Sequence, residues 1–386
     1  MKSALRTIVK NIMDTYISFE CMFVALFQKP KTNRRKVLLL RKDVIGDFIL
    51  FIPTIKHFRR FYKDAELYLV VNTVALDLQS QFPEVDHVIP YDGKQFRSNF
   101  FYRRKFFHNL AKEGFDIVVH AVYSREYICD RMVRVTGAKE RIAFCAEGGK
   151  MTTDAQYTRL IDTPKELNEP DRNMYFLSAV IGEETNIQFP TLDISKFDCK
   201  NAKTLLESLH IEEKKYIVLL PGAGAPYRTW QLEKFAEVAD HIASTHNLKI
   251  LISGSHGDLN LCNKIYELMS KKDMAFVIAG QLDIPNFAHI LHSSLFYFGS
   301  ETGPLHLATA IQTPVVCILG AGHRDRFFPY GDARINRYVA DDAAPCRGDG
   351  WKCSQNLRPG EIAPCIRNIT TDAAKREIKE LLDILR

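Results

Sequence analysis

The sequence contains no apolar run long enough to cross a membrane as a helix. Its 386 residues are 46% hydrophobic and 25% charged, as in ordinary globular proteins, yet no stretch reaches about 18 uncharged apolar residues. The amino terminus also lacks an apolar core followed by a small-residue cleavage site, which a secretion signal would have. A chain of this length has room for two domains, each with its own core.

The sequence also lacks closely spaced pairs of cysteines. Nine cysteines, an odd number, are scattered along the chain, and without a secretion signal they favour a reducing compartment. Cys346, Cys353 and Cys365 come nearest to a metal motif, but their C-x6-C-x11-C spacing is not that of a zinc ribbon and a fourth ligand is not evident. We therefore expect a cytoplasmic protein without a metal site.

Net charge is absent from most of the chain. Residues 1–36 carry eight basic and two acidic side chains, which equals the formal net charge of +6 of the whole sequence, so residues 37–386 are neutral. A neutral body argues against nucleic acid as a partner. In residues 1–35, apolar side chains recur at helical spacing between basic flanks, which predicts an amphipathic helical extension on an anionic membrane surface. A helix packed on the protein itself or on another subunit is the alternative.

From residue 36 onward, short apolar runs alternate with helical patterns. Val37–Leu40 and Tyr216–Leu220 are continuous apolar runs of strand length, as parallel sheets require. The alternation predicts an α/β fold, with residues 190–214 as a linker that has few apolar runs. The other predicted strands are residues 66–71, 88–91, 115–120, 141–144, 249–253, 275–278, 295–298, 315–319 and 337–340.

A turn between a strand and a helix is the first candidate binding site. Glu301, Thr302 and Gly303 follow the apolar run Leu295–Phe298, and Pro304 suits the first turn of the helix that comes next. Open α/β sheets bind ligands at the carboxyl ends of their strands, and free N–H groups at a helix start attract phosphate. The alternative is an ordinary N-cap with a turn glycine.

A glycine-rich loop after the strand Tyr216–Leu220 is the second candidate. It is neither a P-loop nor the dinucleotide fingerprint, since both G-x-x-x-x-G-K-[ST] and G-x-G-x-x-G are lacking. A glycine loop that opens a helix and carries an adjacent cation nevertheless cradles a diphosphate well. The residues concerned are Gly222, Ala223, Gly224, Arg228 and Thr229.

Together with a third segment, these motifs resemble a known family. Three segments occur in the order and spacing of the heptosyltransferase-like glycosyltransferases, glycosyltransferase family nine. They are Val37–Arg41 with Ile45-Gly46-Asp47, Pro221–Gly224 with Arg228-Thr229-Trp230, and Glu301–Leu307. The resemblance covers roughly residues 36 to 370. Two departures concern the donor sugar: the family usually has Asp where this chain has Glu301, and often Lys where it has Arg228.

The resemblance implies a GT-B architecture, in which two Rossmann-like domains face a cleft. Residues 36–200 would bind the acceptor, residues 201–370 the nucleotide sugar, and a terminal helix, residues 371–386, would pack back on the first domain. The implied reaction is an inverting, metal-independent transfer of heptose from ADP-heptose to a glycan such as the lipopolysaccharide inner core, with no cofactor besides the donor. The alternatives are a UDP- or GDP-sugar donor, a protein acceptor, or a non-catalytic, membrane-recruited scaffold that binds nucleotide sugars.

The resemblance also assigns residues to roles. Asp47 becomes the catalytic base, although from its spacing alone it would be an ordinary helix N-cap. His306 would reach the sugar or a phosphate, with a packed core histidine as the alternative. The membrane extension would place the enzyme on the inner face of the cytoplasmic membrane. The expected donor-binding residues are Gly222, Ala223, Gly224, Arg228, Thr229, Asp258, Glu301, Thr302, Gly303, Pro304 and His306. The expected acceptor-binding residues are Arg41, Gly46, Arg104 and Arg125. Of these, Arg125 is chosen because it follows a predicted strand end, and Arg104 because it belongs to a basic cluster interleaved with aromatic residues. Anionic lipid headgroups as the partner of this cluster, or a solvated helix face, are the alternatives.

Overall fold

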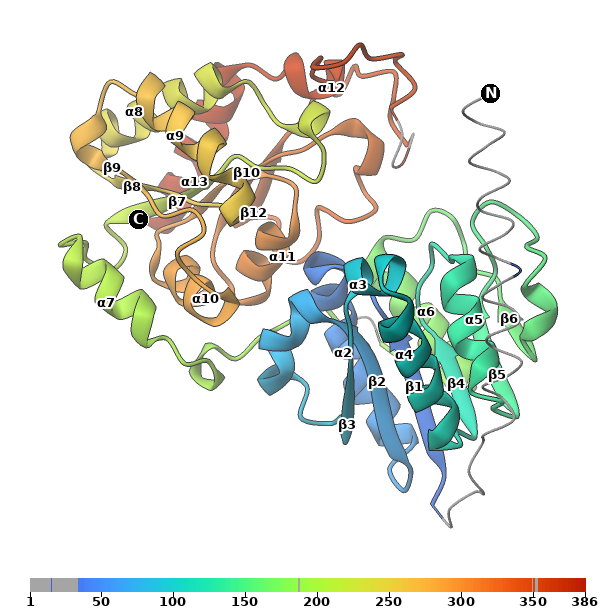
Figure 1. Ribbon diagram of the computed structural model, residues 1–386. Coiled ribbons are helices and arrows are strands. Elements are labelled where there is room, and N and C mark those ends of the chain that lie inside the picture. The colour runs from blue at the N-terminus through green and yellow to red at the C-terminus, as the bar shows by residue number, and fades with distance from the viewer. Residues whose placement is uncertain (1–14, 16–33, 187, 349, 351–352) are drawn as a thin grey trace. The chain divides into compact units, whose positions relative to one another are not determined.

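The protein divides into two compact units, each built on one parallel sheet (Figure 1). The structure, a computed structural model, describes residue 15 and residues 34–186, 188–348, 350 and 353–386. The first unit runs to Phe48 and includes Thr54–Lys165 and Asp171–Ile187, and the second contains Ile49–Pro53, Glu166–Pro170 and Gln188–Arg386. The predicted α/β class is therefore confirmed. The predicted extension, residues 1–35, lies almost wholly outside the described residues.

The first sheet has the strand order β3-β2-β1-β4-β5-β6, with every neighbouring pair parallel. Val37–Leu40 in β1 is fully buried, which explains its uninterrupted apolar sequence. Strand order reverses between β1 and β4, so the loops after these strands lie at a topological switch point. The strands are β1 (Lys36–Arg41), β2 (Glu66–Asn72), β3 (His87–Tyr91), β4 (Ile117–His120), β5 (Glu140–Phe144) and β6 (Arg159–Ile161).

Helices complete the first unit and bury an aromatic core against the sheet. Phe96, Phe107 and Met132 pack with Leu38 and Leu40 of β1. The short strand β6 was not predicted, because it offers only Leu160 and Ile161 as an apolar run. The helices are α2 (Ile45–Phe61), η1 (Thr73–Gln81), α3 (Gly93–Ser98), α4 (Phe100–Glu113), α5 (Tyr127–Val135) and α6 (Glu169–Ile181).

The second sheet has the order β12-β11-β10-β7-β8-β9, again with parallel pairs throughout. Its switch point lies between β7 and β10. The strands are β7 (Tyr216–Leu220), β8 (Lys249–Ile252), β9 (Ala275–Val277), β10 (Tyr297–Ser300), β11 (Val315–Ile318) and β12 (Asn336–Val339). The helices are α7 (Lys200–Ser208), α8 (Leu232–His246), α9 (Leu259–Leu268), α10 (Ile284–Ser293), α11 (Gly303–Ala310), α12 (Pro364–Arg367) and α13 (Thr371–Leu385).

The segment expected to be a linker belongs to the second unit. Residues 190–214 contain α7, whose Ala202 N–H donates to Asn286 Oδ1 of α10 at 2.9 Å. The second unit therefore includes the chain from Gln188 onward, rather than from residue 201. Helix α7 was not predicted because its apolar stripe is thin: Ala202 and Leu206 are its buried residues.

The terminal helix α13 also packs differently from our expectation. It lies against α8, β11 and β12, and its apolar face joins the core that contains Trp230 and Phe235. Lys375 pairs with Glu237 of α8, and Trp230 Nε1 donates to the carbonyl of Ile369 just before the helix. The expectation that this helix packs on the first domain is therefore wrong, because its apolar face is buried in the second. In the described part of the chain, no helix has the length and apolar character to span a membrane.

Candidate active site

The switch point of the second sheet brings the two predicted binding segments together. Strands β7 and β10 are parallel neighbours, so the loops that follow them leave the same edge of the sheet. Ser300 Oγ donates to the carbonyl of Pro221 at 2.8 Å, and Tyr297 Oη donates to the carbonyl of Ser300 at 2.7 Å. These bonds hold the glycine-rich loop and the Glu301-Thr302-Gly303 turn in a fixed relation.

A glycine in β10 allows this close approach. A Cβ atom on Gly299 would lie 2.2 Å from the carbonyl oxygen of Leu220, the last residue of β7. Real atoms do not tolerate such a distance, so a side chain here would push β7 and β10 apart. Because the clash is with a neighbouring strand, this role of Gly299 could not be predicted from the sequence.

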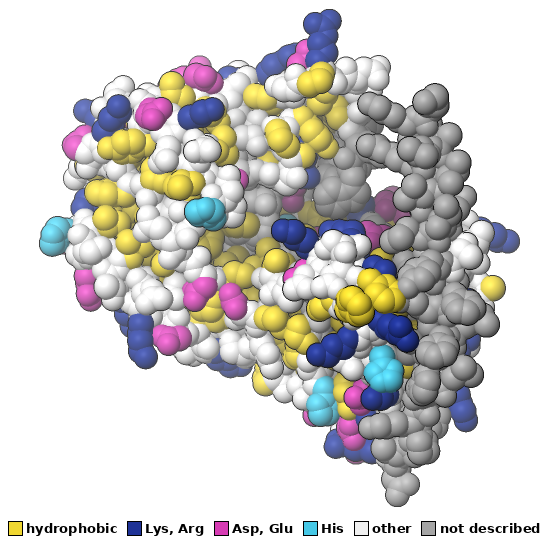
Figure 2. Space-filling model, in the orientation of Figure 1, with side chains coloured by type: hydrophobic (Ala, Val, Ile, Leu, Met, Phe, Trp, Pro, Cys, Tyr) yellow, Lys and Arg dark blue, Asp and Glu magenta, His cyan; other side chains and the backbone are white. Residues whose placement is uncertain are grey.

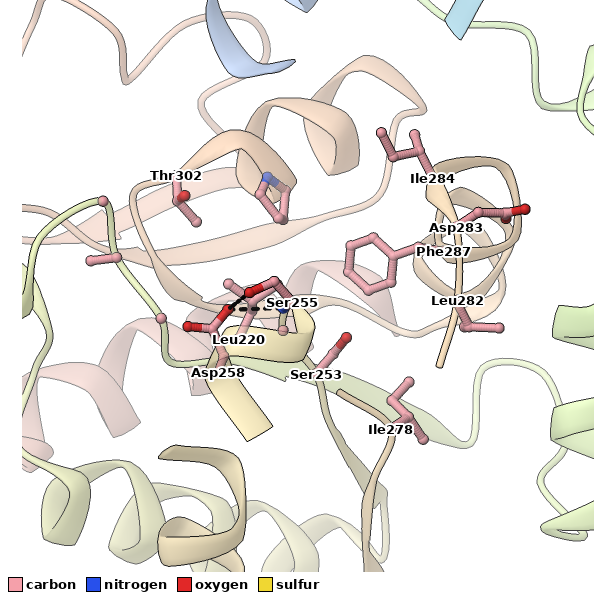
Figure 3. Close-up of a pocket in the computed structure, with 15 residues that line it drawn as sticks. Leu220, Ser253, Ser255, Asp258, Ile278, Leu282, Asp283, Ile284, Phe287 and Thr302 are labelled. Carbon is pink, nitrogen blue, oxygen red and sulfur yellow. Dashed lines mark hydrogen bonds between the residues drawn. The ribbon is translucent and has the colours of Figure 1, made fainter. Parts of the chain in front are cut away.

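A cavity of about 400 Å³ opens beside these loops, within the size range of small-molecule sites (Figure 3). Six of the eleven predicted donor-binding residues line it, namely Gly222, Ala223, Gly224, Asp258, Thr302 and Pro304. Thr302 is the N-cap of α11, so the positive end of that helix lies at the cavity wall. Ser253, Gly254 and Ser255, which follow β8, line it as well.

Asp258 forms part of the wall through a capping box. Its Oδ2 accepts hydrogen bonds from the backbone N–H of Ser255 at 2.8 Å and from Ser255 Oγ at 2.7 Å (Figure 3). A Cβ atom on Gly222 would lie 2.9 Å from Asp258 Oδ1, so the glycine loop passes directly over this carboxylate. A carboxylate repels a phosphate but accepts hydrogen bonds from sugar hydroxyls, which favours a ribose next to Asp258.

Sequence reasoning missed the apolar wall of the cavity. Ile278, Leu282, Ile284 and Phe287 line it, from the end of β9 to the first turns of α10, and Figure 3 shows the Phe287 ring among them. Asp283 lies between them and caps α10 by accepting from Asn286 N at 3.0 Å. A signal was available, since this segment follows a predicted strand at the carboxyl edge of the sheet. An aromatic and aliphatic wall suits a planar base.

Three charged or polar side chains lie next to Thr302 without lining the cavity. Arg228 Nη2 forms an ion pair with Glu301 Oε2, and His306 Nε2 lies 3.6 Å from Glu301 Oε1. Their side chains are 20%, 10% and 4% exposed, respectively. In the chain, Thr229 follows Arg228, and Gly303 follows Thr302. The structure therefore joins the two departures from the family pattern, Arg228 and Glu301, in one ion pair.

His306 is held from behind by two hydroxyl groups. Its Nδ1 lies 3.1 Å from Tyr330 Oη, which lies 2.6 Å from Thr309 Oγ1. Tyr330 Oη thus bridges His306 Nδ1 and Thr309 Oγ1, and Thr309 Oγ1 also lies 3.0 Å from the carbonyl of His306. Burial raises the pKa of Tyr330, so it keeps its proton. With Nδ1 beside Tyr330, Nε2 of His306 faces Glu301.

In the first unit, Gly46 and Asp47 lie at the corresponding switch point, after β1. Helix α2 begins at Ile45 with Val44 as its N-cap, so Asp47 lies in the first turn and is not the cap. Arg41 is 1% exposed, and its Nη2 donates to the carbonyl of Asp47 at 3.2 Å. Our prediction that Arg41 contacts an acceptor is therefore wrong: the side chain is buried and fixes the turn that carries Asp47.

Arg41 also ties this turn to other elements of the unit. Its Nη1 donates to Asn173 Oδ1 of α6 at 3.3 Å and to the carbonyl of Ala121 after β4, and its Nε pairs with Asp43 at 2.8 Å. Gly46 is buried within the first turn of α2.

Arg125 is likewise a structural residue. Its side chain is 0% exposed and pairs with Asp130 at 3.0 Å and with Asp154 at 2.8 Å. Asp130 also accepts from Tyr157 Oη at 2.6 Å and lies 3.5 Å from His120 Nδ1. Burial alone would raise the pKa of Asp130, but hydrogen bonds from His120 and Arg125 hold it below its ordinary value. The prediction that Arg125 binds an acceptor is therefore wrong, because all of this network is internal to the unit.

Of the four predicted acceptor residues, Arg104 has an exposed side chain, on the outer face of α4. The three cysteines of the sequence motif, Cys346, Cys353 and Cys365, line a small cavity of about 30 Å³ together with Arg228. Among the residues that the structure describes, no group of three or more His, Cys, Asp or Glu side chains has an arrangement that could hold a metal ion.

Comparisons with known proteins agree with this geometry. The model of glycosyltransferase family 9 (heptosyltransferase) matches residues 103–354. Lipopolysaccharide heptosyltransferase 3 of Escherichia coli is 21% identical over 303 residues, which cover 77% of this chain and 86% of that protein. A solved glycosyl transferase family 9 protein from Veillonella parvula DSM 2008 superposes with a TM-score of 0.74 at 15% identity, covering 92% of this chain and 99% of that one.

A second solved structure, E. coli heptosyltransferase WaaC with ADP-2-deoxy-2-fluoro heptose, superposes with a TM-score of 0.63 at 17% identity, covering 89% of this chain and 99% of that one. The chain thus has the GT-B-like fold of these enzymes. The family match spans well over half of the sequence and includes both the glycine-rich loop and the Glu301–Leu307 turn. This chain therefore belongs to glycosyltransferase family 9, the heptosyltransferase family, and is a glycosyltransferase.

Proposed function

We propose that this enzyme transfers heptose from ADP-heptose to a glycan acceptor such as the lipopolysaccharide inner core, with inversion at the anomeric carbon and without a metal ion. The observation that carries the proposal is the cavity at the β7/β10 switch point, where a glycine loop, a helix N-terminus and an apolar wall meet. The relatives support the choice of substrates, since one is named a lipopolysaccharide heptosyltransferase and another was solved with an ADP-heptose analogue.

The cavity wall and the residues beside it offer a partner for each part of the donor. The base lies against Ile278 and Phe287, and the ribose hydroxyls donate to the carboxylate of Asp258. The diphosphate accepts from backbone N–H groups of the Gly222–Gly224 loop and from the start of α11. The sugar then extends toward Glu301, whose carboxylate accepts from its hydroxyls.

The first unit supplies the base. Asp47 takes the proton of the acceptor hydroxyl as that oxygen attacks the anomeric carbon. Attack from the face opposite the departing diphosphate inverts this centre. Arg41 supports the step by holding the carbonyl of Asp47, and with it the backbone of the first turn of α2.

Positive charge in the second unit stabilises the leaving group. Negative charge grows on the diphosphate as the sugar leaves, and the N–H groups at the start of α11 are already oriented toward it. The guanidinium of Arg228 has five N–H donors, so it can bind the diphosphate while one nitrogen still pairs with Glu301. These groups supply the charge that a divalent ion would otherwise bring, which is the basis for proposing a metal-independent reaction.

We further propose that residues 1–36 hold the enzyme on the inner face of the cytoplasmic membrane. Their eight basic and two acidic side chains and their helical apolar spacing support this location. The acceptor would then be presented by the same membrane.

The experiment that tests the reaction is a transfer assay on wild-type enzyme and the variant Asp47→Asn, with ADP-heptose and a core-glycan acceptor in the presence of EDTA. We expect wild-type turnover with EDTA, and for Asp47→Asn a loss of at least about 100-fold in kcat with unchanged donor affinity. Equal turnover by the variant would remove Asp47 from the mechanism. Transfer with UDP- or GDP-sugars alone would keep the reaction class and remove heptose.

A further inference from the structure

Helix α4 has a buried face and an outward face of opposite character. Arg103, Phe106, Phe107, Leu110 and Ala111 are buried in the first unit. The outward residues recur at helical spacing and are exposed or half-buried, and they are Phe101, Arg104, Lys105, His108 and Lys112. Among the large apolar side chains that the structure describes, Phe101 is the most exposed, at 79%.

The same surface continues onto α3. Lys94 and Arg97 are exposed there, close to the start of α4. From Gly93 to Glu113 the sequence has one acidic residue, Glu113 itself, at the far end of α4, where it pairs with Lys36 at 3.0 Å. Asp92, just before α3, accepts from the backbone N–H groups of Lys94 and Gln95. The surface is therefore strongly cationic, and Figure 2 shows exposed apolar side chains among Lys and Arg over these helices.

The start of α4 is held rigidly at the carboxyl edge of the first sheet. The backbone N–H of Asp92, just after β3, donates to Tyr102 Oη at 3.0 Å, and Arg103 Nη1 donates to the carbonyl of Phe96 at 3.1 Å. The Phe100 and Phe101 rings pack edge to face, with centroids 5.3 Å apart. Phe101 is thus presented at the same edge of the sheet that carries the Asp47 turn.

We propose that this surface, formed by Lys94, Arg97, Phe101, Arg104 and Lys105, docks on an anionic lipid membrane. The basic side chains approach the lipid headgroups, and the Phe101 ring enters the interface between headgroups and acyl chains. Charge complementarity selects this partner, since cations that surround an exposed aromatic ring match a negatively charged interface with an apolar layer beneath it. The docking is additional to any contact made by residues 1–36, and it brings the acceptor edge of the first unit to the membrane. That last consequence rests on the proposed function.

Vesicle flotation of the full chain tests the docking directly. Wild-type protein should float with phosphatidylcholine vesicles that contain phosphatidylglycerol, and less so at high salt. The double variant Arg97→Glu/Lys105→Glu should lose about tenfold or more in vesicle affinity, because each basic side chain near the surface contributes about fivefold. The matched control is Lys264→Glu/Lys271→Glu, which makes the same charge change at exposed positions of the second unit and should bind as wild type does. Equal loss in both variants, or in neither, would overturn the proposal.

A tryptophan at position 101 tests the insertion. Of the two native tryptophans, Trp230 is fully buried, so the emission of Phe101→Trp can be read as a difference from wild type. We expect a blue shift of this difference spectrum with anionic vesicles and none with neutral ones. An unchanged spectrum with both would contradict insertion of the ring.

A transfer assay distinguishes a lipid surface from an acceptor site. With a water-soluble acceptor fragment, Arg97→Glu/Lys105→Glu should keep wild-type turnover, and with a vesicle-embedded acceptor it should lose most of it. Loss with the soluble fragment together with normal flotation would make the surface an acceptor site and overturn the docking. The flotation result stands even if no transfer is found at all, so failure of the proposed function would be separately visible.

Discussion

Arg125 and Asp130 form a buried ion pair whose loss should be costly. Changing Arg125 to Met leaves Asp130 buried without its cation, which we expect to lower the free energy of unfolding by about 3–5 kcal/mol. Urea denaturation measures this change. Arg134→Met, at an exposed position of α5, the helix that carries Asp130, is the control and should cost less than about 0.5 kcal/mol. Comparable losses in both variants would mean that the pair is not a structural one.

His120 belongs to the same network and gives it a pH dependence. Burial lowers the pKa of this histidine below its ordinary value of 6.5, so the folded protein keeps it neutral where the unfolded chain takes up a proton. Stability rises with pH wherever the unfolded state binds more protons, so the free energy of unfolding should fall as pH drops below about 6.5. Denaturation midpoints between pH 7.5 and pH 5.5 should show this slope. His120→Gln should reduce this slope, whereas His292→Gln, at an exposed site, should leave it unchanged. Equal slopes in the two variants would show that His120 is not the source of the pH dependence.

Tyr330 positions His306 from the side away from Glu301. Tyr330→Phe removes the hydroxyl partner of His306 Nδ1, so we expect the ratio of the two imidazole tautomers to change and kcat to fall by up to about tenfold. Imidazole ¹⁵N chemical shifts report the tautomer independently of activity. Phe328→Leu, a nearby buried apolar change, is the control for general disturbance. An unaltered tautomer in Tyr330→Phe would show that the hydroxyl does not set it.

At the scale of elements, the pairing of β7 and β10 organises the donor site. Gly299→Ala should cost about 1–3 kcal/mol or more, because the new methyl group meets the Leu220 carbonyl of the neighbouring strand. Nucleotide affinity should fall as well, since both binding loops leave these strands. Gly148→Ala, where a Cβ atom meets nothing within 4 Å, is the control. A stable Gly299→Ala protein with normal nucleotide binding would contradict this account of the site.

Elements were predicted well where their sequence reflects their burial. The continuous apolar runs of β1 and β7 and the loop after β7 were recognised because strands buried on both faces show an uninterrupted apolar pattern. The apolar wall of the cavity was missed because Ile278 and Phe287 look like core residues in sequence. Arg41 and Arg125 were wrongly predicted to bind an acceptor. In sequence, a buried arginine with internal partners looks the same as one that binds a ligand.

At the scale of the whole molecule, the two sheets share one strand arrangement but carry different functional residues. Each has a switch point at the carboxyl edge of its central strands, but the first unit places Asp47 there and the second a glycine loop with a helix N-terminus. The resemblance to a family predicted this two-part plan. It also implied that the terminal helix packs on the first domain, whereas α13 packs within the second unit. The amphipathic pattern could not correct this, because it says that a face is buried but not against which partner.

The central claim is that the cavity of the second unit binds the ADP moiety of a sugar donor. The most direct measurement is a calorimetric titration of the full chain with ADP in EDTA, with UDP and GDP titrated alongside. The account predicts one ADP bound per chain without a metal ion, more tightly than either of the other nucleotides. Binding of UDP or GDP in preference to ADP, or binding that requires Mg²⁺, would contradict it.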